Sequence, residues 1–100
     1  MAIHKNKVLN LVGHLVHCDF IGSIGRVQVS IIANQEMHYS FGICLKNGIN
    51  LMFDDTNPHE LIKKYENYIE EWLGRTPASL GIDAYKILGI DRPFMDNYGM

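Results

Sequence analysis

Hydrophobic and polar positions alternate most regularly over residues 39–55, YSFGICLKNGINLMFDD. Every second residue is apolar on either side of an Asn47-Gly48 pair, which is the period of a half-buried strand and predicts a β-hairpin. A two-residue Asn47-Gly48 turn would divide the apolar side chains between the two faces of the hairpin. A three-residue loop over residues 46–48 keeps them on one face and gives Gly48 the left-handed conformation that such loops need. This register pairs Leu45 with Ile49, Ile43 with Leu51 and Phe41 with Phe53.

The segment from Val8 to Phe20 is apolar on both of its faces and is expected to form one strand. Gly22-Ser23 then fits a two-residue turn, followed by a strand from Gly25 to Asn34. In this register opposite charges meet outside and apolar residues meet inside. The first strand should place Val12, Val16 and Phe20 towards the core and Leu9, Leu11 and Leu15 away from it. The second strand should place Val27, Val29, Ile31 and Ala33 towards the core.

A helix is predicted from Pro58 to Leu73, with Asn57 as its cap and Gly74 at its end. Its apolar stripe should cover the inward face of the sheet. The stripe consists of Leu61, Ile62, Tyr65, Ile69, Trp72 and Leu73. A shorter helix is expected within 81–89. The predicted fold is therefore α+β, a four-stranded antiparallel β-meander covered on one face by an amphipathic helix, plus a short C-terminal helix. One domain is expected over residues 1–100, with 91–100 as a tail.

The composition does not alter the predicted fold, but it argues against nucleic-acid binding and against a membrane-spanning protein. The chain has 100 residues, is 47% apolar and carries a net charge of −2, so no broad attraction to nucleic acid or to anionic membranes is expected. The aromatic residues of the hairpin should point inward, away from any RNA-binding platform. No segment reaches the roughly 20 apolar residues that span a bilayer. Two cysteines without repeated spacing favour a reducing compartment, and we expect a cytoplasmic protein.

Three groups of residues could carry chemistry. His14, His17 and Cys18 are the densest reactive cluster, but in a single strand they cannot converge on one zinc ion. Cys18 should be buried and Cys44 should be the more accessible thiol, without a basic neighbour to lower its pKa. Asp54-Asp55 precedes a helix start, where acidic residues are favourable without any catalytic role. We therefore expect no enzyme activity, no catalytic residue, no metal and no cofactor.

The unusual feature is the apolar outer face of the first strand. Two alternatives could cover it: the C-terminal segment, through Ile82, Ile87, Ile90 or Phe94, or another protein chain, including a second copy of this one. The residues expected to contact a partner are Leu11, Leu15, Ile32, His17 and Gln28.

The function expected from these features is non-enzymatic protein binding, as an adaptor or a small inhibitor of a larger complex. Compact proteins of this kind are common among the accessory proteins of phages and mobile elements. The alternative is a nucleic-acid or small-ligand binding module.

Overall fold

The computed structural model describes residues 8–11, 13–31 and 36–92. Their helices and strands follow one another as β1 (Val8–Leu11), β2 (His14–His17), the 3-10 turn η1 (Cys18–Phe20), β3 (Ile21–Ile24), β4 (Gln28–Ile31), β5 (Met37–Leu45), β6 (Asn50–Asp55), α1 (Pro58–Leu73), the 3-10 turn η2 (Ala78–Leu80) and α2 (Ala84–Leu88). The predicted α+β class is confirmed, with antiparallel sheets of two and four strands, one main helix and one short helix.

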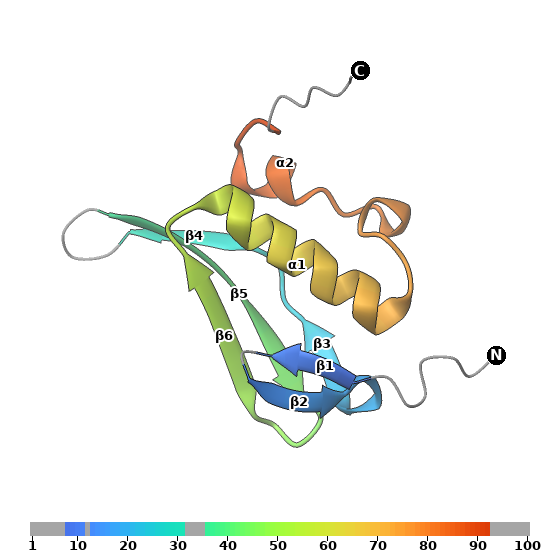
Figure 1. The fold of residues 1–100 in the computed structure, drawn as a ribbon. Coiled ribbons are helices and arrows are strands. Elements are labelled where there is room, and N and C mark those ends of the chain that lie inside the picture. The colour runs from blue at the N-terminus through green and yellow to red at the C-terminus, as the bar shows by residue number, and fades with distance from the viewer. Residues whose placement is uncertain (1–7, 12, 32–35, 93–100) are drawn as a thin grey trace.

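β5 is the central strand of the four-stranded sheet. β6 pairs along one edge of β5, while β4 and β3 share its other edge, β4 along residues 37–40 and β3 along residues 43–45. The resulting order β3-β5-β4, with β6 on the opposite side, differs from the sequential meander that was predicted. β1 and β2 form a separate hairpin, which lies with α1 on the same side of the larger sheet (Figure 1).

The register of the β5–β6 hairpin is confirmed. Phe41 lies opposite Phe53 and Ile43 opposite Leu51, and the Leu45 amide donates to the Ile49 carbonyl at 2.8 Å. Gly48 has the predicted positive φ, 92°.

α1 begins and ends where the sequence predicts. The Asn57 side chain accepts hydrogen bonds from the His59 and Glu60 amides, and Gly74 ends the helix in the left-handed conformation. The helix buries Leu61, Ile62, Tyr65 and Ile69. The Tyr65 ring meets Phe41 edge-on at 5.2 Å between ring centres, so α1 covers the middle of the sheet.

The single strand predicted over residues 8–20 is wrong, because the chain reverses between Leu11 and His14. Gly13 has a φ of 87° and its amide donates to the Asn10 side chain at 2.8 Å. The reversal resets the alternation, so that Leu9 lies opposite Val16 and shares its face. Leu9 and Leu11 therefore belong to the buried core and do not point outward as expected.

The turn predicted at Gly22-Ser23 is also wrong. Both residues lie within β3, which pairs with β5 and places Ile21 opposite Leu45 and Ile24 opposite Ile43. The long central strand offers more backbone hydrogen-bonding groups than β4 can use, and β3 occupies the remainder. Phe20, expected to point inward, is 42% exposed in η1.

Gly48→Val should lower the free energy of unfolding by about 1–2 kcal/mol, because a β-branched residue resists positive φ. Apart from Gly48 and its two chain neighbours, no residue has an atom within 4 Å of the position of the added Cβ, so backbone strain and not a clash sets this cost. Gly48→Asn, which tolerates positive φ, is the matched control and should lose much less. Denaturant melts measure both values. Equal losses for the two variants would contradict the loop conformation.

Leu11 and Leu15 provide a matched pair for the β1–β2 hairpin, because Leu11 is 1% exposed and Leu15 is 75% exposed. Leu11→Ala should cost about 2–5 kcal/mol through lost burial and a cavity. Leu15→Ala should stay within about 0.5 kcal/mol of the unsubstituted chain. The midpoints of chemical denaturation distinguish them. A larger loss for Leu15→Ala would mean that the hairpin presents its other face to the core.

Candidate functional site

The main candidate site is a hollow of about 410 Å³ beside β2, which we call the β2 hollow. It is lined by Leu15, Val16, His17, Asp19, Phe20 and Leu45. Val16 and Leu45 are buried, whereas Leu15 and Phe20 are exposed at its sides. The hollow thus combines an apolar floor with two exposed apolar side chains, and His17 and Asp19 add polar groups.

The position of η1 creates this hollow. The Phe20 carbonyl accepts a hydrogen bond from the Lys46 amide at 2.8 Å, which holds η1 at the end of β5. Cys18 is buried, and its Sγ donates to the Glu71 carbonyl of α1 at 3.7 Å. Because both ends of this short turn are held, the chain between β2 and β3 presents Asp19 and Phe20 to solvent.

The structure brings together two of the residues predicted to contact a partner. Leu15 and His17 share one face of the hairpin and both line the β2 hollow. Leu11 is in the core, where it also borders a smaller hollow of about 200 Å³ between the hairpin and β6. Gln28 lies opposite Ser40 on the face of the sheet turned away from α1, and Ile32 is outside the described residues.

Asp19, Phe20 and Leu45 were missed as members of this site. The first two were expected within a continuous strand, and nothing in their spacing predicts the 3-10 turn. A signal for the preceding reversal was present, because Asn10 is followed three residues later by Gly13, a common pairing in turns. Leu45 could not be found in this way, because it joins the site from a distant strand.

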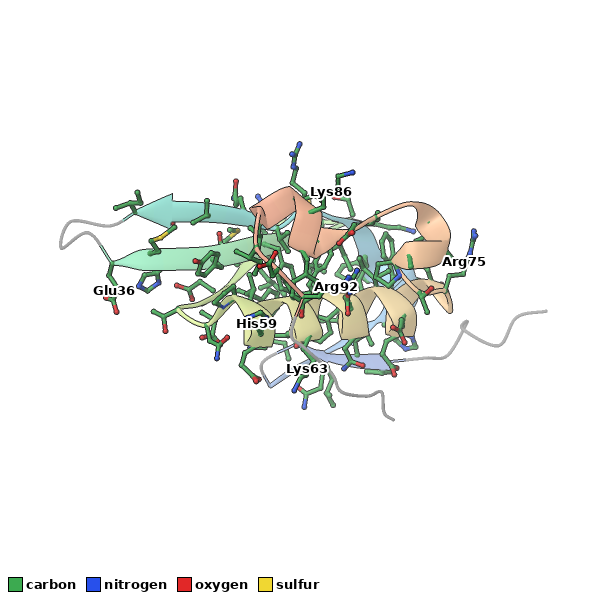
Figure 2. All side chains as sticks on the ribbon, turned by 90° about the horizontal axis from the view of Figure 1, so that it is seen from above. Glu36, His59, Lys63, Arg75, Lys86 and Arg92 are labelled. Carbon is green, nitrogen blue, oxygen red and sulfur yellow. The ribbon has the colours of Figure 1, made fainter. Side chains whose placement is uncertain are left out.

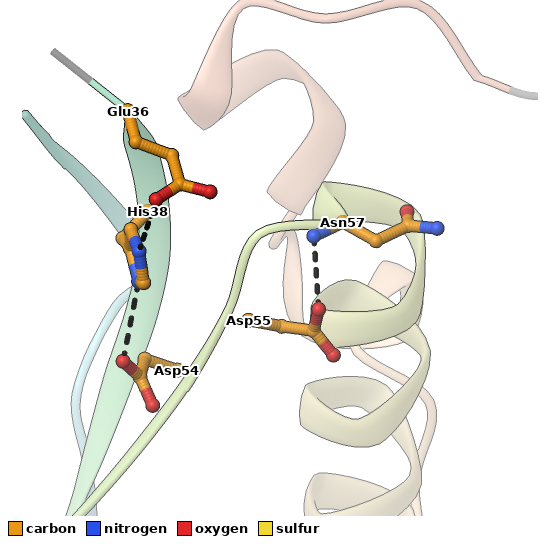
Figure 3. A network of polar contacts seen from close by, with 5 residues as sticks. All are labelled: Glu36, His38, Asp54, Asp55 and Asn57. Carbon is orange, nitrogen blue, oxygen red and sulfur yellow. Dashed lines mark hydrogen bonds and ion pairs between the residues drawn. The ribbon is translucent and has the colours of Figure 1, made fainter. Parts of the chain in front are cut away.

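A second cluster of polar side chains surrounds His38, on the face of the four-stranded sheet that is turned away from α1 (Figure 3). The His38 Nδ1 lies 3.4 Å from an Asp54 carboxylate oxygen, and its Nε2 lies 3.8 Å from a Glu36 oxygen. An imidazole next to a carboxylate is a common general base, but it needs a bound substrate to act on. Neither of the two hollows described above includes His38. The cluster links β5 to β6 and lies outside both of these hollows.

The two acidic residues before α1 have different partners. Asp54 contacts His38 across the ladder, which the sequence did not indicate. Asp55 accepts a hydrogen bond from the Asn57 amide at 2.9 Å and thereby fixes the turn into the helix (Figure 3). This second contact agrees with the helix-start interpretation of the pair.

A third cluster joins α1 to α2. The Arg92 guanidinium lies over the Tyr85 ring at 4.8 Å and 3.2 Å from an Asp83 carboxylate oxygen. The Tyr85 ring in turn lies 5.7 Å from that of His59, in the first turn of α1. These ring and ion-pair contacts hold α2 against α1.

Burial changes the ionisation of several groups along α1. Desolvation raises the pKa of Glu66; the nearby Arg92 lowers it in part, while Glu70 and Asp83 raise it further. Desolvation also raises the pKa of Tyr65, with a smaller contribution from Glu66, and the pKa of Tyr68. The shift of Glu66 arises where α1 meets the segment around α2, next to Arg92 and Asp83, and none of these groups lines the β2 hollow.

Four of the basic side chains lie apart from one another. Lys63, Arg75, Lys86 and Arg92 lie in different directions around the molecule (Figure 2). Phe41 and Phe53 are buried under α1, as predicted. These four cations and the two buried rings do not form a basic aromatic platform of the kind that RNA-binding sheets use.

Cys18 is buried and Cys44 is partly exposed, as the sequence predicts, and the two are not joined by a disulfide. Within residues 8–11, 13–31 and 36–92, no three His, Cys, Asp or Glu side chains are grouped so that they could hold a metal ion. Neither helix in these ranges has the length and apolar character needed to cross a bilayer.

Comparison with known proteins provides no identification. The chain matches no protein-family model, no curated protein and no solved structure.

Glu66→Gln should stabilise the protein at neutral pH. The pKa of Glu66 is raised on folding, so its charged form costs folding free energy above that pKa, and this cost disappears as pH falls below the ordinary value of 4.5. Thermal melts should show a higher midpoint for Glu66→Gln than for the unsubstituted chain at neutral pH and a vanishing difference in acid.

Glu60→Gln is the control with the opposite sign, because Glu60 lies in the first turn of α1, where its charge favours the helix dipole. It should lower the midpoint at neutral pH. A lower midpoint for Glu66→Gln as well would contradict the desolvation of Glu66.

Proposed function

We propose that this protein is a non-enzymatic protein-binding module that acts as an adaptor or a small inhibitor of a larger complex. The observation that carries the proposal is the β2 hollow. Leu15 is 75% exposed and Phe20 is 42% exposed, and both stand beside an apolar floor. Exposed apolar groups around a concave surface favour interaction with another molecule.

The arrangement of the hollow fits the anatomy of a protein interface. Interfaces concentrate binding energy in a few aromatic and aliphatic anchors that enter apolar pockets, and they surround these anchors with polar groups. Phe20 and Leu15 are suited to the first role, and His17 and Asp19 to the second. The carboxylate of Asp19 favours a partner that presents a basic or N–H donor group next to an apolar side chain.

The proposal is for a binding protein and not an enzyme because the polar clusters lack a catalytic arrangement. His38 lies between carboxylates on the face of the sheet opposite α1, and Arg92 lies between Asp83 and Tyr85. Both clusters join elements of the fold to each other. A cytoplasmic location is part of the proposal, since two cysteines without a disulfide framework suit a reducing compartment.

A small apolar ligand is the second candidate, favoured by the size of the hollow. Its volume of about 410 Å³ falls within the range of roughly 300–1,000 Å³ that ligand pockets occupy. Its lining of apolar residues with two polar side chains also matches such pockets.

The decisive experiment is an affinity capture with a matched pair of variants. Leu15→Lys places a charge at the hollow, whereas Ile87→Lys changes an exposed apolar residue of α2 at the other end of the molecule (Figure 1). A partner captured by the unsubstituted chain and identified by mass spectrometry should bind Ile87→Lys equally well. Leu15→Lys should bind the purified partner at least about tenfold more weakly, a loss of 1.4 kcal/mol.

Full binding by Leu15→Lys would contradict the β2 hollow as the partner site. Saturable binding of a small apolar compound by the purified chain, abolished in Leu15→Lys, would instead favour the ligand-binding alternative. Melting curves of both variants establish that each is folded, which the high exposure of Leu15 leads us to expect.

A further inference from the structure

A second exposed apolar region lies on the β4–β5 arm, which consists of β4 and residues 37–40 of β5. β4 pairs with these residues, from Gln28 opposite Ser40 to Ile31 opposite Met37. The last pair of the β5–β6 ladder is Tyr39 with Asp55, so Met37 lies beyond the end of β6. The arm projects past α1 (Figure 1).

The two faces of the arm differ in polarity. Ladder pairs place Val29, Ile31 and Met37 on the face that carries Phe41 further along β5. At Phe41 this face of the sheet is covered by α1. Along the arm the face is open to solvent: Val29 is 44% exposed, Ile31 is 68% exposed and Met37 is 46% exposed. The arm therefore continues the apolar face of the sheet beyond α1, and although α2 contacts β4, these three side chains stay exposed.

The outer edge of β4 is suited to pairing with another strand. In the described residues its only strand partner is β5, so the backbone groups on its other edge have no ladder. Edge strands that stay single are usually protected by a charged residue, a proline or a bulge. The sequence of β4, QVSI, contains no charged residue and no proline.

We propose that β4 pairs antiparallel with β4 of a second copy of this chain, forming a homodimer with one continuous sheet. The alternation of β4 determines the register. With Ser30 opposite Ser30, Val29 of each copy lies opposite Ile31 of the other, and all four apolar side chains share one face. A shift by one residue places Val29 opposite Ser30 and mixes the two faces.

This self-complementarity is the reason for choosing a second copy over an unrelated strand. A two-fold axis perpendicular to the sheet keeps both copies of α1 on the same side, so the apolar faces of the two arms join. Met37, on the neighbouring strand, extends that apolar strip in each copy. A net charge of −2 per chain produces little repulsion between the copies.

The dimer goes beyond the proposed function and is independent of it. β2, which carries three of the residues that line the β2 hollow, lies away from β4 (Figure 1), so the pairing of two arms does not involve the hollow. A dimer would present two such hollows to its partners. A failure to dimerise therefore does not contradict partner binding at the β2 hollow, and a failure to bind a partner there does not contradict the dimer.

Sedimentation over a wide range of concentration tests the dimer. The unsubstituted chain should approach the mass of two chains as its concentration rises. Ile31→Lys should sediment as one chain throughout, because it places a lysine among the apolar side chains of the seam. Leu15→Lys is the matched control on an exposed residue far from β4, and it should dimerise like the unsubstituted chain.

Two results would overturn the proposal. One is an unsubstituted chain that stays a monomer at every concentration, which would leave the edge of β4 to a strand of some other protein. The other is undiminished dimerisation of Ile31→Lys, which would place the interface elsewhere. Unchanged melting of Ile31→Lys at monomeric concentrations shows that a lost dimer is not lost folding.

Cross-linking tests the register. In a Cys44→Ser background, Ser30→Cys should form a disulfide-linked dimer, because directly opposite residues have Cα atoms about 4.5–5.5 Å apart, within the range that a disulfide bridges. Gln28→Cys, on the same face, would lie roughly 13 Å from its counterpart, four residues along the strand, and should stay unlinked. Linking of Gln28→Cys but not Ser30→Cys would overturn the register.

Discussion

The packing of Phe41 between β6 and α1 is the interaction on which the rest of the structure depends. Phe41 stacks on Phe53 at 5.2 Å between ring centres, meets Tyr65 edge-on at the same distance and has no exposed surface. A slip of one residue in the β5–β6 ladder would turn Phe41 away from the helix and exchange the buried and exposed faces of the strand. The register of this hairpin therefore positions α1, and through α1 it positions α2.

α1 and the β1–β2 hairpin cover most of one apolar sheet face, and α2 contacts β4 beside them. α1 packs over Phe41 and Phe53, while the β1–β2 hairpin buries Leu9, Leu11 and Val16 beside it. The Tyr68 hydroxyl of α1 donates to the Asn10 carbonyl at 3.3 Å and joins the two covers. Neither cover extends over the β4–β5 arm at one end or closes the β2 hollow at the other. The two proposed contact surfaces are the two places where this single layer of cover ends.

The candidate site was predictable only in part. Leu15 and His17 are two residues apart on one strand, so they share a face in any extended structure, and the structure brings them together. In one continuous strand Leu11 would share a face with Leu15 and His17, as the sequence predicts. Because the chain reverses before His14, Leu11 instead lies on the opposite face, in the core. Gln28 lies on β4, which pairs with β5 as the predicted strand order requires, but it lies on the face turned away from α1 and outside the hollow. Leu45 reaches the hollow only through the pairing of β3 with β5.

The sequence by itself determined the elements whose signals are local. Asn57, Pro58 and Gly74 define the two ends of α1. The alternation of apolar residues on either side of Gly48 allows only one hairpin register with all of them on one face. Both features depend on residues that are close together in the chain. Only the tertiary structure decided that β3 pairs with β5 and which face of the β1–β2 hairpin is buried. Val8–Phe20 is apolar on both faces, so alternation alone does not indicate which face is buried. The buried face is decided by where the N-terminal strands pack: β3 pairs with the free edge of β5, and the β1–β2 hairpin packs beside α1. Neither of these packing surfaces exists before the rest of the chain has folded.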